Sequence, residues 1–218
     1  MRKLSVNTFV SLDGVMQAPG GPAEDPSRQF RFGGWTVTFW DQVMGEAMGE
    51  GFGEPFELLL GRKTYEIFAA HWPYIDNDPV ADRLNSVTKH VASRTLDTVN
   101  WTASQLLDGD AATAIEHLKR RDGPPLQVQG SSNLLQTLWR HDLVDEFRVW
   151  TFPVLLGRGK RLFEPGLPAG ALRLVDSRTS TTGVVISSYE RSGEVPLGSF
   201  VPVEPSEAEL RRRERLTE

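Results

Sequence analysis

Three short stretches of this sequence combine glycine, hydroxyl-bearing and basic residues, the types that bind phosphate groups in proteins. They are Gly61-Arg62-Lys63-Thr64, Ser93-Arg94-Thr95 and Gly130-Ser131-Ser132-Asn133-Leu134. Each follows an apolar run typical of a buried strand, and ligands of α/β proteins collect where such strands end. An arginine at position 62 can bind a phosphate through two parallel hydrogen bonds. Three such turns in one domain predict a single groove for an extended, phosphate-bearing ligand.

Each stretch also has an ordinary structural interpretation. Thr64 can cap a helix while Arg62 stays in solvent, and the stretch at Ser93 can be a simple polar turn. The stretch at Gly130 matches neither the G-x-G-x-x-G fingerprint nor the Walker A loop, so a standard Rossmann or P-loop domain is not expected. Only the combination of the three stretches favours a ligand groove.

Two carboxylates, Asp13 and Asp41, are candidates for proton delivery or substrate anchoring beside such a groove. Asp13 precedes a glycine, a pair that often forms a turn through its own side chain. Asp41 precedes an expected helix, where a carboxylate stabilises the N-terminus. Both aspartates therefore have a structural alternative. Four apolar residues are candidates for the wall of a flat heterocycle or, alternatively, for the core: Met16, Trp35, Phe39 and Trp40.

Composition excludes several other kinds of site. The chain has no cysteine, which rules out disulfides, thiolate nucleophiles and cysteine-ligated zinc. His71 and His90 lack partners at metal-ligand spacing, so we expect no metal. A net charge of −5 argues against nucleic-acid binding. No apolar run is long enough to span a bilayer, and the absence of cysteine leads us to expect a cytoplasmic protein.

The elements that must position these residues follow from hydrophobic periodicity. Strands are predicted at 4–10, 56–60, 90–93, 99–102, 126–128, 146–152, 172–175 and 184–189. Helices are predicted at 35–48, 64–70, 80–89, 111–121 and 132–139, the fourth capped by Asp110 and the fifth by Ser132 or Asn133. Strands alternate with helices and then stand alone, which predicts an α/β fold with a mainly parallel sheet and an antiparallel element near the C-terminus.

No domain break is evident before residue 192. We therefore expect one domain over residues 1–192, followed by a charged extension over residues 193–218. This extension either contains an exposed helix over residues 206–215 or is disordered.

An ordered set of motifs gives the sequence a specific resemblance. The motifs are Ser11-Leu12-Asp13-Gly14, Leu60-Gly61-Arg62-Lys63-Thr64-Tyr65-Glu66, Lys89-His90-Val91-Ala92-Ser93-Arg94-Thr95-Leu96, Gly130-Ser131-Ser132-Asn133-Leu134, Val144-Asp145-Glu146-Phe147 and Pro153-Val154-Leu155-Leu156-Gly157-Arg158-Gly159-Lys160-Arg161-Leu162-Phe163. Together they resemble the dihydrofolate-reductase-like family, typified by the C-terminal reductase domain of the riboflavin-biosynthesis deaminase-reductase. The resemblance spans residues 2–191, and this chain looks like a stand-alone member.

The resemblance implies a three-layer fold, with a mixed, mostly parallel sheet of about eight strands between helices on both faces. It implies NADPH as hydride donor. The stretch at Gly61 would then lie at the adenosine phosphate end, and the stretch at Ser93 beside the adenosine. The stretch at Gly130 would cover the pyrophosphate, and Gly14 and Val15 would approach the nicotinamide. Members of the family often form homodimers.

The expected function is therefore an NADPH-dependent reductase of a small heterocyclic substrate, pterin-like or pyrimidine-like, or of a carbonyl compound. Hydride transfer needs the nicotinamide held against an electrophilic carbon and little covalent help from the protein. The alternative is a non-catalytic nucleotide-binding or scaffold protein that keeps the groove without turnover. The expected partners are a small-molecule substrate and a second copy of the chain.

Overall fold

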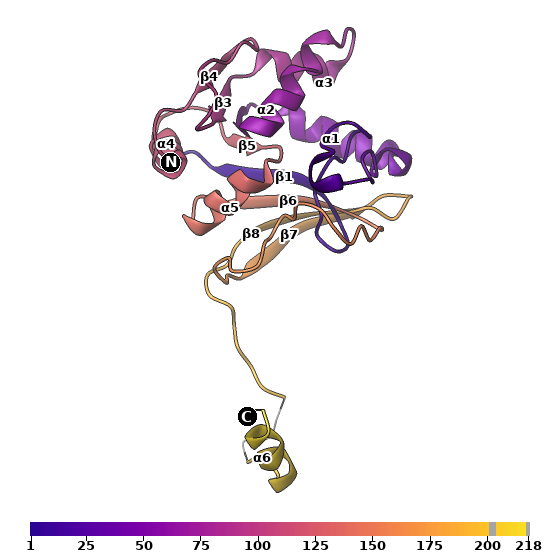
Figure 1. Ribbon diagram of the computed structural model, residues 1–218, viewed down its shortest axis with the longest axis vertical. Coiled ribbons are helices and arrows are strands. Elements are labelled where there is room, and N and C mark those ends of the chain that lie inside the picture. Colours follow the sequence, from indigo (N-terminus) through magenta and orange to yellow (C-terminus); the bar gives the residue numbers. More distant parts are fainter. Residues whose placement is uncertain (201–203, 217–218) are drawn as a thin grey trace.

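A computed structural model describes residues 1–200 and 204–216, in which one sheet lies between layers of helices (Figure 1). The strands are β1 Leu4–Ser11, β2 Glu57–Gly61, β3 Lys89–Ala92, β4 Ser104–Leu106, β5 Leu126–Val128, β6 Glu146–Phe152, β7 Leu172–Thr179 and β8 Val185–Arg191. The helices are α1 Gln42–Gly53, α2 Arg62–Ala69, α3 Pro79–Ser86, α4 Ala111–Arg120, α5 Ser132–Arg140 and α6 Glu207–Glu214. Short 3-10 turns lie at Ser27–Gln29, Val37–Phe39 and Trp72–Tyr74.

The eight strands form one sheet in the order β4-β3-β2-β5-β1-β6-β8-β7. Neighbouring strands from β4 to β6 are parallel, and β8 pairs antiparallel with both β6 and β7. The predicted fold class is therefore confirmed, including the antiparallel element at the C-terminal end. Because β2, β3 and β5 are parallel, their carboxyl ends share one edge of the sheet, and each is followed by one of the three polar stretches.

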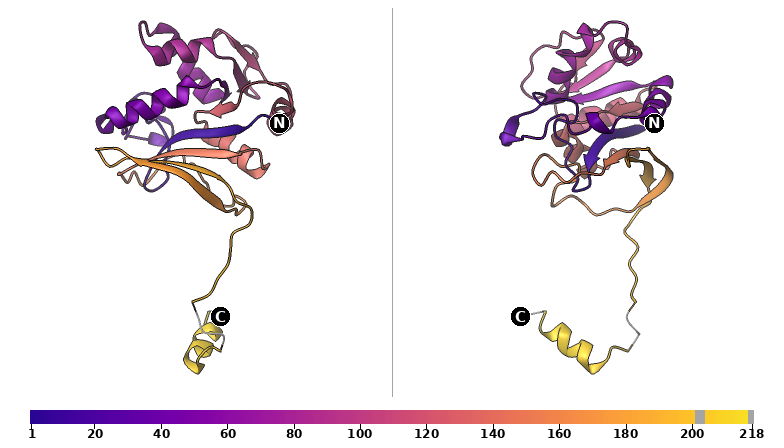
Figure 2. Two further views of the ribbon diagram at one scale, coloured as in Figure 1. Left: turned by 180° about the vertical axis from the view of Figure 1, so that it is seen from behind. Right: turned by 90° about the vertical axis from the view of Figure 1, so that its right-hand side faces the viewer.

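Alternate side chains of the central strands enter different layers of the core. Leu59, Leu126 and Val128 pack with α4 and α5 on one face, here called face A. Leu58 and Leu60 point to the opposite face B, where they pack with α2 and α3. Helix α1 covers a second apolar cluster on face B, over β6 and β8. Figure 2 shows these helices on both sides of the sheet.

Several local predictions are confirmed at their caps. Asp110 accepts a hydrogen bond from the Thr113 amide at 3.0 Å and begins α4. Ser206 caps α6 in the same way, so the C-terminal extension does contain the expected helix. This extension leaves the rest of the molecule and carries α6 away from it (Figures 1 and 2). No helix in the described part of the chain combines the length and apolar character that crossing a bilayer requires.

Four local predictions were wrong, the first because a tertiary contact overrides the local pattern. The segment 99–102 is not a strand: its buried Trp101 packs against Tyr65, whose hydroxyl accepts from the amides of Asn100 and Trp101. The helix expected at 80–89 ends at Ser86, and Lys89 instead begins β3.

The helix expected from residue 35 begins only at Gln42, after a separate 3-10 turn. The predicted cap of α5 was also wrong. Neither Ser132 nor Asn133 caps it, since the N-cap residue is Ser131 in the left-handed region.

Candidate functional site

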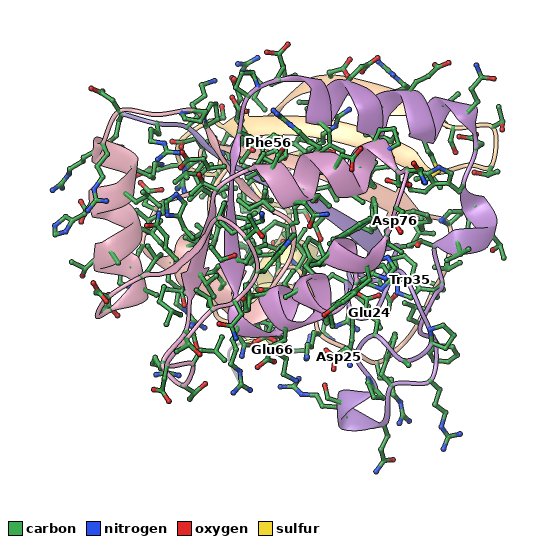
Figure 3. All side chains as sticks on the ribbon, turned by 90° about the horizontal axis from the view of Figure 1, so that it is seen from above. Glu24, Asp25, Trp35, Phe56, Glu66 and Asp76 are labelled. Carbon is green, nitrogen blue, oxygen red and sulfur yellow. The ribbon has the colours of Figure 1, made fainter. Side chains whose placement is uncertain are left out.

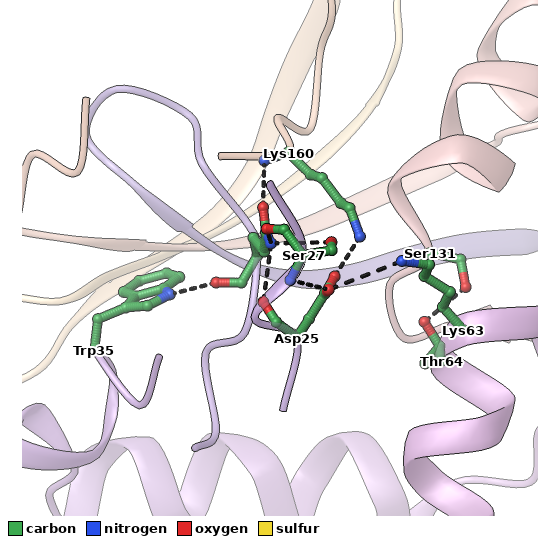
Figure 4. Close-up of polar contacts among 8 residues, drawn as sticks. Asp25, Ser27, Trp35, Lys63, Thr64, Ser131 and Lys160 are labelled. Atoms are coloured by element: carbon green, nitrogen blue, oxygen red, sulfur yellow. Dashed lines mark hydrogen bonds and ion pairs between the residues drawn. The ribbon is translucent and has the colours of Figure 1, made fainter. Parts of the chain in front are cut away.

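The three polar stretches meet along one edge of the sheet and touch one another. The Ser131 hydroxyl accepts a hydrogen bond from the Gly61 amide (3.0 Å) and donates one to the Thr64 hydroxyl (2.6 Å; Figure 4). On the other side of the first stretch, the Arg62 guanidinium donates to the Thr95 hydroxyl at 2.9 Å. The three turns therefore form one continuous polar surface, held together by their own side chains.

Two helices begin at this surface, and they differ from the others in the described residues. A side chain caps the N-terminus of α1, α3, α4 and α6, whereas α2 and α5 have no side-chain cap. The first amides of α2 and α5 thus keep their capacity to bind an external acceptor. Such amides, together with the positive end of the helix dipole, favour an anion.

The backbone of the third turn packs closely against the first turn. Gly130 and Ser131 have φ angles of 107° and 74°. A Cβ atom at Gly61 would lie 2.6 Å from the Ser131 Cβ, so the first and third turns approach as closely as only glycine permits. A Cβ atom at Gly130 would lie 3.7 Å from Thr64 Oγ1 and 3.9 Å from the Cε of Met16, which reaches this turn from the loop after β1.

The first stretch has two exposed basic side chains, whereas the hydroxyl of Ser93 in the second stretch is already hydrogen-bonded. The side chains of Arg62 and Lys63 are 43% and 52% exposed, so both cations are accessible. The Ser93 hydroxyl accepts from the amides of Thr95 (3.1 Å) and Leu96 (3.0 Å). Ser93 therefore shapes the second turn.

The other predicted residues divide by burial. Arg94 and Asn133 are exposed, whereas Ser132 and Leu134 are buried, Leu134 within the core of face A. A ligand at α5 would therefore meet the backbone of Ser132 and Leu134 rather than their side chains.

Asp13 lies in the loop after β1 and forms hydrogen bonds with the segment 153–163, the last motif of the family resemblance. Its carboxylate accepts from the Ser11 hydroxyl (2.6 Å) and from the amides of Leu156 (3.0 Å) and Gly157 (2.8 Å). Burial opposes a charge on this group, but these hydrogen bonds outweigh it and hold the pKa of Asp13 below its usual value. Both carboxylate oxygens are engaged, which favours the structural interpretation of Asp13.

The neighbouring residues Gly14 and Val15 are tied to the same segment. The Gly14 carbonyl accepts from the Leu162 amide at 3.0 Å, and the fully buried Val15 forms a β-bridge with Arg161. The Arg161 guanidinium also donates to the Asp13 carbonyl. The loop after β1 and the segment 153–163 thus form one connected unit at the edge of the sheet.

Asp41 is the N-cap of α1 and lies against the β7–β8 hairpin. One carboxylate oxygen accepts from the Met44 amide at 2.9 Å, and the other accepts from the amide (2.6 Å) and hydroxyl (2.7 Å) of Thr181. The bond from Met44, followed by those from Thr181, lowers the pKa of Asp41. Its geometry favours the structural interpretation here as well.

A polar cluster that sequence reasoning missed lies beside Lys63 (Figure 4). The Lys160 ammonium donates to one oxygen of Asp25, and the Lys63 ammonium lies 3.9 Å from the other. The Gln17 amide, which is 3% exposed, donates to the carbonyls of Asp25 and Ser27, both at 2.9 Å, and accepts from the Lys160 amide at 3.1 Å. These contacts fix the loop over residues 17–36 against the segment 153–163.

Glu24 adjoins this cluster (Figure 3). One of its oxygens accepts from the amides of Gly20 (2.6 Å) and Gly21 (3.2 Å). Burial is the main influence on this carboxyl and raises the pKa of Glu24 above its usual value, with a smaller contribution from Asp25. Its hydrogen bonds hold the glycine-rich tip of the loop.

A strip of polar side chains runs across face B on the central strands. Asn7, Gln127, Gln129 and Arg148 are all half-buried and separate the apolar cluster under α1 from the cluster under α2 and α3. Gln129 donates to Gln127 (3.1 Å), and Arg148 donates to the Ala47 carbonyl of α1 (3.0 Å). Central strands covered on both faces are normally apolar there, so these half-buried polar groups distinguish the strip from the two apolar clusters beside it.

Aromatic residues border this strip. Trp40, which is 45% exposed, stacks on Trp150 with an interplanar angle of 8°, and Phe9 meets both rings edge to face. Trp35 and Phe39 pack instead into the core of face B. Of the predicted wall, Trp40 is therefore the most exposed residue, whereas Phe39 is half-buried and Trp35 and Met16 are buried.

Comparison with known proteins shows the family and the fold of this chain. Residues 2–186 match the model of a family described as the RibD C-terminal domain. The chain belongs to this family. The uncharacterized protein YyaP of Bacillus subtilis (strain 168) is 27% identical over 197 residues, which cover 88% of this chain and 96% of YyaP.

Two solved structures show the same fold. A putative riboflavin biosynthesis protein from Shewanella sp. PV-4 superposes with a TM-score of 0.61 at 20% identity, over 88% of this chain and 99% of the other. Dihydrofolate reductase from Enterococcus faecalis, complexed with NADP(H) and RAB-propyl, superposes with a TM-score of 0.55 at 13% identity, over 87% and 96% of the two chains. The suspected resemblance to the dihydrofolate-reductase-like fold is confirmed, and the RibD C-terminal domain family is one of oxidoreductases.

Proposed function

We propose that this member of the RibD C-terminal domain family is an NADPH-dependent reductase that transfers hydride to a small heterocyclic substrate, pterin-like or pyrimidine-like, or to a carbonyl compound. The observation that carries the proposal is the meeting of two uncapped helices, α2 and α5, at one surface of three joined polar turns. The other α-helices in the described residues each have a side-chain cap, so α2 and α5 differ from them in their free N-terminal amides. The arrangement suits a ligand with more than one phosphate.

The residues of this surface fit the cofactor in charge and in hydrogen-bonding groups. Arg62 and Lys63 are accessible cations for its adenosine phosphates, with Ser93, Arg94 and Thr95 beside the adenosine. Gly61 and Thr64 join them to the backbone of Gly130, Ser131, Ser132, Asn133 and Leu134, which would hold the pyrophosphate. Gly14 and Val15 would lie near the nicotinamide. When bound, the cofactor supplies the hydride.

The polar strip on face B is the proposed substrate side. Gln129 presents an amide group that matches the polar edge of a flat heterocycle. Gln127, which donates to the Gly51 carbonyl of α1 and accepts from Gln129, positions it, and Arg148 adds a fixed cation. Gln129 directly precedes Gly130, so the strip adjoins the proposed pyrophosphate turn. In this proposal Asp13 and Asp41 position loops and are not proton donors, since hydrogen bonds occupy them and lower the pKa of each.

Quaternary structure is part of the proposal. We infer that residues 1–192 form the reductase domain and that two copies pair through face A of β6, β8 and β7. This face carries an open apolar cavity of about 310 Å³, lined in part by Val149, Phe163 and Tyr189. Leu174, which lies opposite Tyr189 on the edge strand and is 52% exposed, continues the apolar surface. Such a surface is larger than an isolated exposed side chain and fits a self-complementary contact.

The proposal is tested by titrating the protein with NADPH and NADH while following tryptophan fluorescence. Pterins, pyrimidines and quinoid carbonyls are then screened for oxidation of NADPH. Saturable binding with turnover of one substrate class supports the reductase. Binding without turnover of any class supports the non-catalytic alternative, which membership of an oxidoreductase family disfavours. No saturable response to either nucleotide refutes the cofactor assignment.

A further inference from the structure

Two lysines from distant parts of the chain converge on one carboxylate at the edge of the proposed phosphate surface. Lys63 is the second residue of α2, and Lys160 belongs to the segment 153–163. The Asp25 carboxylate lies between them and contacts both ammonium groups (Figure 4). The Ser27 amide adds a third donor at 3.2 Å.

The two lysines differ in how deeply they are buried. Asp25 and Lys160 are 13% and 14% exposed, whereas Lys63 is 52% exposed. Burial is the main influence that lowers the pKa of Lys160, and the nearby Lys63 adds to it while Asp25 opposes it. Two neighbouring ammonium groups repel each other, and an anion that lies between them offsets this repulsion. Asp25 supplies that anion from within the chain.

The same carboxylate opposes binding of an external anion. Lys63 precedes Thr64 at the uncapped start of α2, where a phosphate is proposed to bind. A phosphate there would compete with Asp25 for the Lys63 ammonium, and its negative charge would be repelled by the Asp25 carboxylate. The anion of the chain and the anion of the ligand therefore exclude each other at one cation.

We propose that Asp25 is a resident anion that occupies the Lys63–Lys160 cation pair and is displaced from Lys63 by a phosphate-bearing ligand. The proposal rests on the proposed function only in taking Lys63 as part of a phosphate site. Because Asp25 lies in the loop over residues 17–36, its displacement removes the contact of this loop with Lys63 and leaves the loop held by Lys160 and Gln17. By linkage, the factor by which bound phosphate weakens the Lys63–Asp25 contact equals the factor by which that contact weakens phosphate binding.

The test uses inorganic pyrophosphate as the probe, measured by calorimetry at low salt in the full chain. Asp25→Asn removes the competing charge and should bind pyrophosphate roughly five- to tenfold more tightly than the wild type. Asp25→Glu keeps the charge and should bind as the wild type does. Asp76→Asn, at an exposed loop position, changes the net charge equally and should leave the affinity unchanged. In a Lys63→Met background, Asp25→Asn should give no gain.

A second measurement needs no substitution. Hydrogen exchange of the wild type should become faster over residues 17–27 when pyrophosphate is added, while exchange slows over residues 61–65. Slower exchange over residues 17–27, or an Asp25→Asn affinity equal to or weaker than that of Asp76→Asn, overturns the proposal. NADPH is titrated in parallel: a wild type that fails to bind NADPH refutes the proposed function, whereas the pyrophosphate results judge the role of Asp25 independently.

Discussion

The Ser131 hydroxyl donates a 2.6 Å hydrogen bond to the Thr64 hydroxyl and so joins the starts of α5 and α2. Both residues belong to stretches that are ordinary polar turns when taken alone. Their contact places the uncapped ends of two helices side by side, where the partial positive charges of the helix dipoles add. A ligand with two linked phosphates can satisfy both ends at once, which neither turn can do separately.

Removing the Arg62 side chain should distinguish the two nicotinamide cofactors. Arg62→Ala is expected to weaken NADPH binding by roughly 1.5–3 kcal/mol, the range of a charged hydrogen bond, because only NADPH carries the 2′-phosphate. NADH binding should hardly change. Both affinities are measured by fluorescence titration. Arg62→Lys is the matched variant, since it keeps the charge but lacks the planar fork. Equal losses for the two nucleotides would show that Arg62 does not contact the 2′-phosphate.

Adding one methyl group at Gly61 should separate the first and third turns. A Cβ atom there would meet the Ser131 side chain at 2.6 Å, so Gly61→Ala is expected to lower the free energy of unfolding by about 1–3 kcal/mol and to weaken NADPH binding. Gly45→Ala in α1 is the control. Apart from its chain neighbours and the nearby backbone of α1, no atom lies within 4 Å of the new methyl group, so this change should stabilise the helix by roughly 0.5–1 kcal/mol. Urea unfolding measures both, and tolerance of Gly61→Ala would refute the close contact.

The sequence predicts those features that depend on neighbouring residues. The apolar run that becomes β2 and the Asp110 cap of α4 are local patterns, and both predictions are confirmed. The segment 99–102 failed because its aromatic and β-branched residues suit a strand, whereas burial of Trp101 against Tyr65 decides its conformation.

The parts of the site that sequence reasoning missed depend on longer-range contacts. Asp25 and Lys160 are 135 residues apart, and no local pattern pairs them. Gln127 and Gln129 did carry a signal, because amides alternate with apolar residues in an otherwise buried central strand. Their proximity to α1 depends on packing that a single sequence does not reveal.

The polar strip on face B should affect the substrate and not the cofactor. Gln129→Leu removes an amide and is expected to lower kcat/KM for the substrate class found in the screen by roughly three- to tenfold, the range of a neutral hydrogen bond. The dissociation constant for NADPH should stay within about twofold of the wild type. Gln42→Leu, at an exposed position of α1, is the control. An equal loss in cofactor affinity would show that Gln129 contributes to binding of the cofactor and not of the substrate alone.

Charge on face A should disrupt the proposed homodimer. Wild-type protein is expected to elute as a dimer in size-exclusion chromatography with light scattering. Leu174→Lys places an ammonium group within the apolar surface and should shift the protein towards the monomer, because an unpaired charge in an interface is costly. Val37→Lys, at a 58% exposed position on the 3-10 turn before α1, should leave the dimer intact. A monomeric wild type would contradict this interface.

Stability should fall in mild acid because of one buried histidine. His90 on β3 lies 2.7 Å from the Glu57 carboxylate and 2.9 Å from the Gln105 amide. Burial is the main influence and lowers the pKa of His90 below its usual 6.5, although the hydrogen bond that His90 donates to Glu57 opposes the shift. As the pH drops below 6.5, the unfolded chain takes up a proton at this residue while the folded chain does not, so the unfolded state is favoured.

The decline is measured by urea unfolding between about pH 7.5 and pH 5, a window in which histidine titrates. His90→Gln, which retains a hydrogen-bond donor for Glu57, should show a smaller decline than the wild type. Glu57 adds to the decline only at pH values below this window. Burial disfavours its charge, but hydrogen bonds from His90 and Arg2 hold its pKa below the usual 4.5, so the stability it provides is lost as the pH falls below that value. An identical decline in His90→Gln and wild type between pH 7.5 and 5 would assign the acid sensitivity to other groups.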